Sequence, residues 1–87
     1  MRNDHELINK ILPLAEAGNP HAQYAVGLIY AEGRGVKADR VQAYIWLSRA
    51  ISQGDNDSIL LRDVLMNEMS QQDIALAEKE LTKQLLH

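Results

Sequence analysis

The sequence has 87 residues, of which 46% are hydrophobic and 24% are charged, and its formal net charge is −3. This composition predicts one globular domain with a modest core, and it excludes a disordered chain and a long apolar membrane span. The negative charge and the scattered basic residues exclude a nucleic-acid partner, because phosphates favour clustered lysine and arginine. The absence of cysteine and of an apolar signal segment near the N-terminus fits a cytoplasmic location.

The first two helices are predicted from apolar residues that recur at three and four positions, a helical rather than a strand period. We expect the first helix at about residues 4–17, ended by Gly18. Asn19 and Pro20 are typical of a helix start, because the asparagine side chain accepts from free N–H groups and proline has none to leave unpaired. The second helix then runs over about residues 20–32 and should be the most buried.

A turn at residues 33–39 leads into the third helix. Gly33 and Gly35 can supply the positive φ that a tight turn requires, and Asp39 can cap the following helix. The third helix is expected from about 40 to 53, with one apolar and one polar face.

Two further helices follow. Residues 55–57 start a fourth helix that ends at about residue 68. Ser70 begins a Ser-x-x-acid arrangement, which is typical of a helix start. The fifth helix is expected at residues 71–86, and its single apolar stripe suits a helix that closes the end of a fold. The chain is therefore predicted to be all-α with five helices.

The sequence contains an internal repeat. Residues 17–19 (Ala-Gly-Asn) and 53–55 (Gln-Gly-Asp) stand 36 positions apart, and the same shift places small residues over small ones and large over large in the helices that follow. A unit of two antiparallel helices of this length is typical of helical solenoids, in which each hairpin packs on the next. The repeat therefore predicts a short α-solenoid of antiparallel helix hairpins.

Small and aromatic residues occupy fixed positions in the second and third helices and in the turn between them. The Gly-x-Gly-Val-x-x-Asp turn at residues 33–39 is the most specific part of this pattern. The pattern resembles the Sel-one-like repeat, a relative of the tetratricopeptide repeat. Its signature positions here are Ala22, Gly27, Tyr30, Gly33, Gly35, Asp39, Ala43, Trp46 and Ala50.

The resemblance divides the chain, taken as one domain over residues 1–87, into four parts. These are a half unit at 4–18, a full repeat at about 15–53, a degenerate unit at 54–69 and a C-terminal capping helix at 70–87.

The resemblance also implies a function. Proteins of this kind are expected to be adaptors or scaffolds that bind a protein or peptide on the concave face lined by the second and fourth helices. The candidate contacts on that face are Gln23, Tyr24, Arg62 and Asp63. For Tyr24 a place in the core between the hairpins is an equally good interpretation.

Two other functions stay open. Val41 and Ile45 are apolar residues on the outer side of the third helix and are candidate self-association contacts, which favours a small homodimeric regulatory subunit. A hydrolase-like or ligand-binding activity is implied by some family members outside the cytoplasm. Those proteins have disulfide-linked repeats, and this chain has no cysteine.

The sequence offers no constellation that points to catalysis or metal binding. His5, His21 and His87 lie on separate elements without metal-ligand spacing. Gly33 and Gly35 lack the preceding strand and the following Gly-Lys-Ser/Thr of a phosphate loop. We therefore expect neither an enzyme nor a cofactor.

Overall fold

The computed structural model describes residues 4–85, and that part of the chain contains helices and turns but no strand. The helices are α1 (Asp4–Glu16), α2 (Pro20–Glu32), α3 (Arg40–Ser52), α4 (Asn56–Glu68) and α5 (Gln71–Leu85). The all-α prediction with five helices is confirmed for the described residues, and most helix ends fall within one residue of the expected positions. The end of the predicted fifth helix at residue 86, and His87, lie outside them.

Each of the later helices begins at a capping side chain. The side chains of Asn19, Asp39, Asp55 and Ser70 each accept a hydrogen bond from the backbone N–H three residues further on, at 3.0–3.2 Å. Such bonds satisfy N–H groups that have no partner within the helix, and each contributes about 1 kcal/mol. Local sequence therefore fixes where α2, α3, α4 and α5 start.

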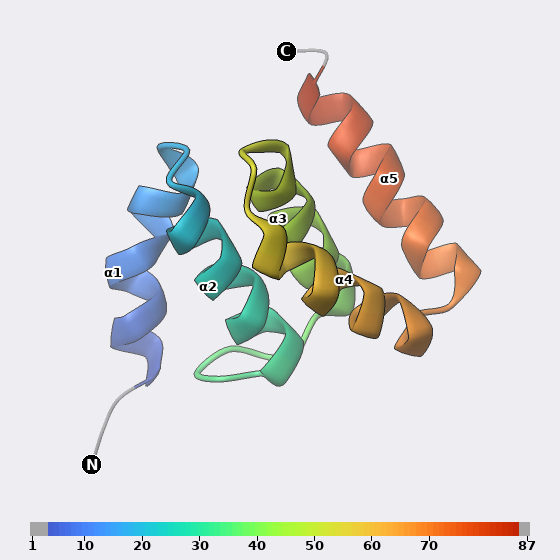
Figure 1. Ribbon diagram of the computed structural model, residues 1–87. Helices are drawn as coiled ribbons and strands as arrows, with labels where there is room; N and C mark the ends of the chain where they lie inside the picture. Colours follow the sequence, from blue (N-terminus) through green and yellow to red (C-terminus); the bar gives the residue numbers. More distant parts are fainter. Residues whose placement is uncertain (1–3, 86–87) are drawn as a thin grey trace.

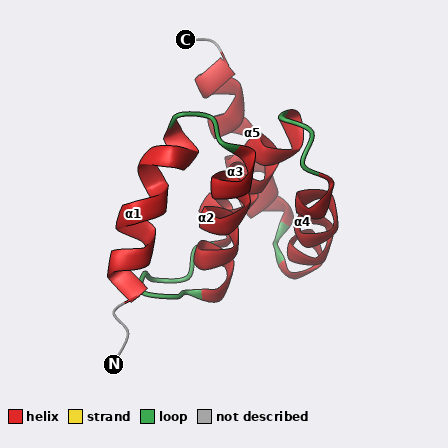
Figure 2. Cartoon of the chain, turned by 60° about the vertical axis from the view of Figure 1, so that its left-hand side comes forward, coloured by secondary structure: helices red, strands yellow, loops and turns green. Residues whose placement is uncertain are grey.

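The helices form a short solenoid. Helix α1 packs on α2, α2 packs on α3, and α3 contacts both α4 and α5. In Figure 1, α1 stands at the left beside α2, α4 passes in front of α3, and α5 forms the red end of the molecule. Figure 2 shows the same stack from the side, with short loops joining the antiparallel helices. Helix α5 packs mainly on α3 and not on α4, its neighbour in the sequence.

Small residues bring α2 and α3 together. A Cβ atom at Gly27 would lie 2.8 Å from the Cγ and Cδ2 atoms of Leu47. Leu47 has no solvent exposure, and neither do Ala43 and Ala50 on the same helix. The missing side chain at Gly27 therefore leaves the space that Leu47 fills.

Two glycines in the turn between α2 and α3 adopt backbone angles that other residues rarely adopt. Gly33 and Gly35 have φ angles of 70° and 73°, in the left-handed region that other residues rarely adopt. The backbone N–H of Asp39 donates to the carbonyl oxygen of Tyr30 at 2.9 Å, which ties the end of the turn back to α2. The turn is thus a structural element that sets the hairpin.

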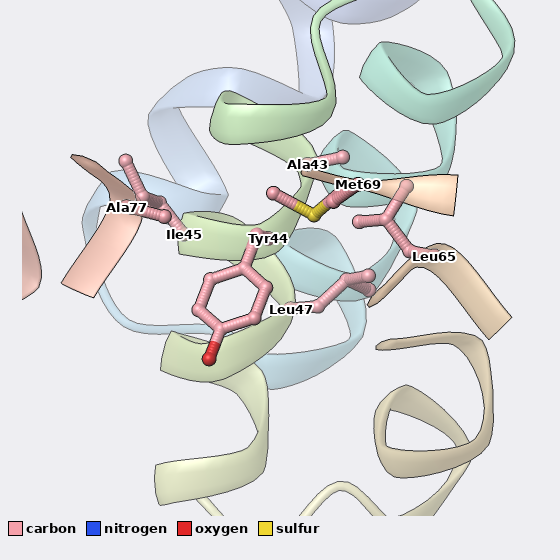
Figure 3. Close-up of a cluster of buried hydrophobic side chains, with 7 residues drawn as sticks. All are labelled: Ala43, Tyr44, Ile45, Leu47, Leu65, Met69 and Ala77. Atoms are coloured by element: carbon pink, nitrogen blue, oxygen red, sulfur yellow. The ribbon is translucent and has the colours of Figure 1, made fainter. Parts of the chain in front are cut away.

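The core has two parts. The first lies where α3 meets α4 and α5, and Figure 3 shows its side chains; it comprises Ala43, Tyr44, Ile45, Leu47, Leu65, Met69 and Ala77. The second lies where α3 meets α1 and α2; it comprises Ala15, Ala22, Val26 and Trp46. Helix α3 contributes to both parts and is the central helix of the fold.

The predicted self-association contacts are not an open surface. Ile45 is only 2% exposed and belongs to the same cluster as Ala77 of α5, next to which it lies in Figure 3. Val41 is partly buried and packs against that cluster. Ile45 is therefore not a surface residue as predicted, because α5 folds back over the outer side of α3, whereas Val41 keeps part of its surface exposed.

No helix within residues 4–85 combines the length and the apolar content needed to cross a membrane.

Candidate partner-binding pocket

A pocket of about 480 Å³ opens where α2, α3, α4 and α5 meet. Most of its lining residues have polar side chains, although apolar atoms, including those of Leu81, make up more of the exposed lining surface. The polar lining residues include Gln23, Ser48, Arg49, Arg62, Glu78 and Thr82.

Gln23 forms a buried part of the pocket wall. Its side chain, in a residue only 1% exposed, donates from Nε2 to the carbonyl oxygen of Ala15 at 3.0 Å and so ties α2 to α1. The other amide atom, Oε1, is buried and has no hydrogen-bond partner among the described residues. Gln23, predicted as a contact on an open face, is instead buried, and this bond holds its side chain against α1.

The Arg62 side chain extends from α4 to α3. Its Nη1 atom donates to the Oγ atom of Ser48 at 3.0 Å, and its guanidinium carbon lies 5.5 Å from the centre of the Tyr44 ring. The Nε atom is buried and has no acceptor within the described part of the chain. At the pocket, Arg62 therefore has one donor, Nη1, in a hydrogen bond and another, Nε, without an acceptor among the described residues.

Tyr44 and Glu78 join α3 to α5 beside the pocket. The Tyr44 hydroxyl donates to Glu78 Oε2 at 2.5 Å. Burial, and then the hydrogen bond to Glu78 and its negative charge, raise the pKa of Tyr44 to about 12, while the charge of Arg62 acts in the opposite direction. The tyrosine is thus a neutral donor that engages the Glu78 carboxylate over the ordinary pH range.

Arg49 places a second cation at the pocket. Its guanidinium carbon lies 4.3 Å from the centre of the Trp46 ring, within the range of a cation–π interaction. The pocket therefore contains two guanidinium groups and one carboxylate, that of Glu78. Hydroxyl and amide side chains add further hydrogen-bonding groups, and Leu81 contributes apolar surface.

Comparison with known proteins identifies the repeat. The Sel1 repeat family matches residues 20–55, which include α2, the glycine turn and α3. Residues 20–55 of the chain therefore form a Sel1 repeat. Sel1 repeats are in general non-catalytic modules that bind other proteins.

A curated relative supports the Sel1 assignment. The "Alginate biosynthesis protein AlgK" of Azotobacter vinelandii is 33% identical over 81 residues, which are 92% of this chain. The chain spans only 16% of the length of that relative. No solved structure matches the chain at a significant level.

The Sel1 fold brings together two of the four predicted contacts. Gln23 and Arg62 both line the pocket, whereas Tyr24 packs against the α3–α5 core cluster and Asp63 is exposed outside the pocket lining. Glu78 and Thr82 also line the pocket and were not predicted, because nothing in the sequence placed α5 beside α3.

Within residues 4–85, no three histidine or acidic side chains are grouped so that they could hold a metal ion. The Sel1 module does carry exposed apolar side chains on α4, where Leu60 is 71% and Val64 is 57% exposed. These residues lie outside the pocket lining and form a separate surface.

Proposed function

We propose that this chain is an adaptor or scaffold module that binds a protein or peptide partner in the pocket between α2, α3, α4 and α5. The observation that carries the proposal is the pair of unpaired buried atoms at this wall, Gln23 Oε1 and Arg62 Nε. A buried polar group without a partner costs about 1–3 kcal/mol. Both atoms are covered in the free protein, so a ligand recovers that free energy once the two side chains turn toward the pocket. The Sel1 repeat at residues 20–55 supports a protein as the ligand.

The proposed module acts by binding, without catalysis and without a cofactor. Its partner is a protein rather than a nucleic acid or a membrane. The name of the similar protein associates that protein with alginate biosynthesis, so proteins of polysaccharide synthesis are the first class of partner to test. The cytoplasmic location stays a prediction.

A pull-down followed by mass spectrometry tests this function. The bait is the full chain in three forms: unchanged, Arg62→Ala and Arg34→Ala. Arg34 is an exposed arginine that pairs with Glu32 outside the pocket lining, so it serves as a matched control. We expect the same partner with the unchanged and Arg34→Ala baits and its loss with Arg62→Ala, once circular dichroism has shown that all three baits fold. A partner retained by Arg62→Ala, or no partner at all, contradicts the proposal.

Self-association is the second candidate function, and the exposed Leu60 and Val64 favour it. A solenoid this short has few neighbouring hairpins, and a second copy could cover these apolar side chains. Sedimentation over a concentration series separates the two functions. A dimer that Leu60→Lys abolishes supports self-association, and a strictly monomeric chain at every concentration removes it.

A further inference from the structure

We propose that the pocket recognises an acidic side chain of a partner peptide, with Arg62 and Arg49 binding the carboxylate and Gln23 accepting from the peptide backbone. This inference rests on the proposed function and specifies the chemistry of the partner.

The unpaired Nε atom of Arg62 is the first argument. A guanidinium group has five N–H donors in a planar fork, and a carboxylate accepts two of them in parallel. Ser48 occupies Nη1, while Nε has no acceptor among the described residues. Nε is covered in the free protein, so the guanidinium must turn toward the pocket when a carboxylate binds.

The charge of the pocket is the second argument. Arg49 lines the same pocket as Arg62, and its guanidinium lies over the Trp46 ring. The single opposing carboxylate, on Glu78, already accepts from the Tyr44 hydroxyl. The lining therefore carries an excess of positive charge, although the whole chain has a net charge of −3. This excess favours an anionic group.

Gln23 favours a peptide over a simple anion. Its Oε1 atom is an acceptor in a residue that is 99% buried, so the amide must also turn toward the pocket, where it requires a donor. Inorganic phosphate has no N–H group, and its one or two P–OH donors belong to the same small anion that the arginines bind. An acidic residue within a peptide offers a carboxylate to the arginines and a backbone N–H to Gln23.

A displayed library of random short peptides tests the proposal, with the full chain as the immobilised target. We expect the selected peptides to share an aspartate or glutamate at one position. Synthetic copies in which that residue is changed to asparagine or glutamine should bind at least about tenfold more weakly, because a charge-assisted pair is lost. This comparison uses only the unchanged protein and so does not depend on the folding of a variant.

A conservative protein variant supplies the second comparison. Arg62→Lys keeps the positive charge but removes the planar fork, so the acidic peptide should again bind about tenfold more weakly. Arg34→Lys is the matched control and should leave the affinity unchanged. Inorganic phosphate should compete poorly with the peptide.

The outcomes distinguish this inference from the proposed function. Selected peptides that lack an acidic residue, or that bind Arg62→Lys and the unchanged chain equally, overturn the inference and leave protein binding intact. Phosphate that competes as well as the peptide also overturns it. A chain that captures neither a peptide nor a protein overturns both.

Discussion

Gly27 determines how closely α2 and α3 can approach, and Gly27→Ala tests this. The added Cβ atom meets the fully buried Leu47 at 2.8 Å, and overpacking of this kind costs about 1–3 kcal/mol. Alanine recovers about 1 kcal/mol through its better helix propensity. We expect a net loss of about 1 kcal/mol in the free energy of unfolding, measured with urea. In a Leu47→Ala background the same change should be neutral or stabilising, and an equal loss in both backgrounds contradicts the steric explanation.

Trp46 is the largest side chain of the cluster between α1, α2 and α3. It is 8% exposed, and its ring also supports the Arg49 guanidinium. Trp46→Ala should reduce the free energy of unfolding by about 3–5 kcal/mol. The measurement is urea unfolding followed by circular dichroism, because the chain has no other tryptophan. Leu60→Ala, on the exposed face of α4, is the control and should change stability by less than about 0.5 kcal/mol.

Tyr44 gives the protein a dependence on alkaline pH. Burial and the contact with Glu78 raise the pKa of the folded tyrosine from 10.0 to about 12. Between these pH values the unfolded chain releases the proton while the folded chain keeps it, so stability falls as the pH rises. The contribution is fully present below pH 10.0 and is lost as the pH passes 12.

The measurement compares urea unfolding of the unchanged chain and of Tyr44→Phe across this pH range. The unchanged chain should lose stability more steeply than the variant, because phenylalanine has no proton to release. Parallel losses in the two proteins would show that Tyr44 does not cause the effect.

At the scale of the elements, α5 packs against the rest of the fold through one face only. Ala77 has no solvent exposure and belongs to the cluster around Tyr44 and Ile45, whereas Ala75 on the same helix is exposed. Ala77→Leu should therefore force α5 away from α3 at a cost of about 1–3 kcal/mol. Hydrogen exchange of the α5 amides should accelerate in this variant and stay unchanged in Ala75→Leu. Equal behaviour of the two variants contradicts the packing of α5 described above.

The helices could be predicted from local sequence because their ends are local features. Asn19, Asp39 and Asp55 cap the helices that they precede, and each bond spans three residues. The position of α5 could not be predicted in this way. Its apolar stripe indicates that one face is buried, but it does not say which helix covers that face. For this reason the sequence places Ile45 on the outer side of the third helix, whereas in the structure it lies under α5.

The candidate pocket was predictable only in part, for the same reason. Gln23 and Arg62 were found as polar residues on the two helices expected to line a groove. The bond from Gln23 to Ala15, which buries the side chain, joins residues in different helices, and its geometry has no sequence signal. Glu78 could not be linked to Tyr44, 34 residues earlier, before the packing of α5 was known.

At the scale of the whole molecule, the stack should be most stable at its centre. Helix α3 contacts α2, α4 and α5, whereas α1 packs mainly on α2. In a solenoid, stability arises from contacts between neighbours, so the ends open first. Hydrogen exchange should be slowest for the amides of α2 and α3 and faster for those of α1 and α5. Uniform protection of all five helices would instead show that the chain unfolds only as a single unit.

The pocket has walls on four helices, and one of them, α5, supplies Glu78 and Thr82. The pocket is therefore complete only while α5 packs on α3. Ligand binding to the pocket and the docking of α5 are thus thermodynamically linked. A ligand that binds only the complete cavity stabilises the docked helix by the same free energy that docking adds to the affinity. Ala77→Leu should thus weaken partner binding although Ala77 is not part of the pocket lining, and a saturating partner should slow the exchange of the α5 amides again.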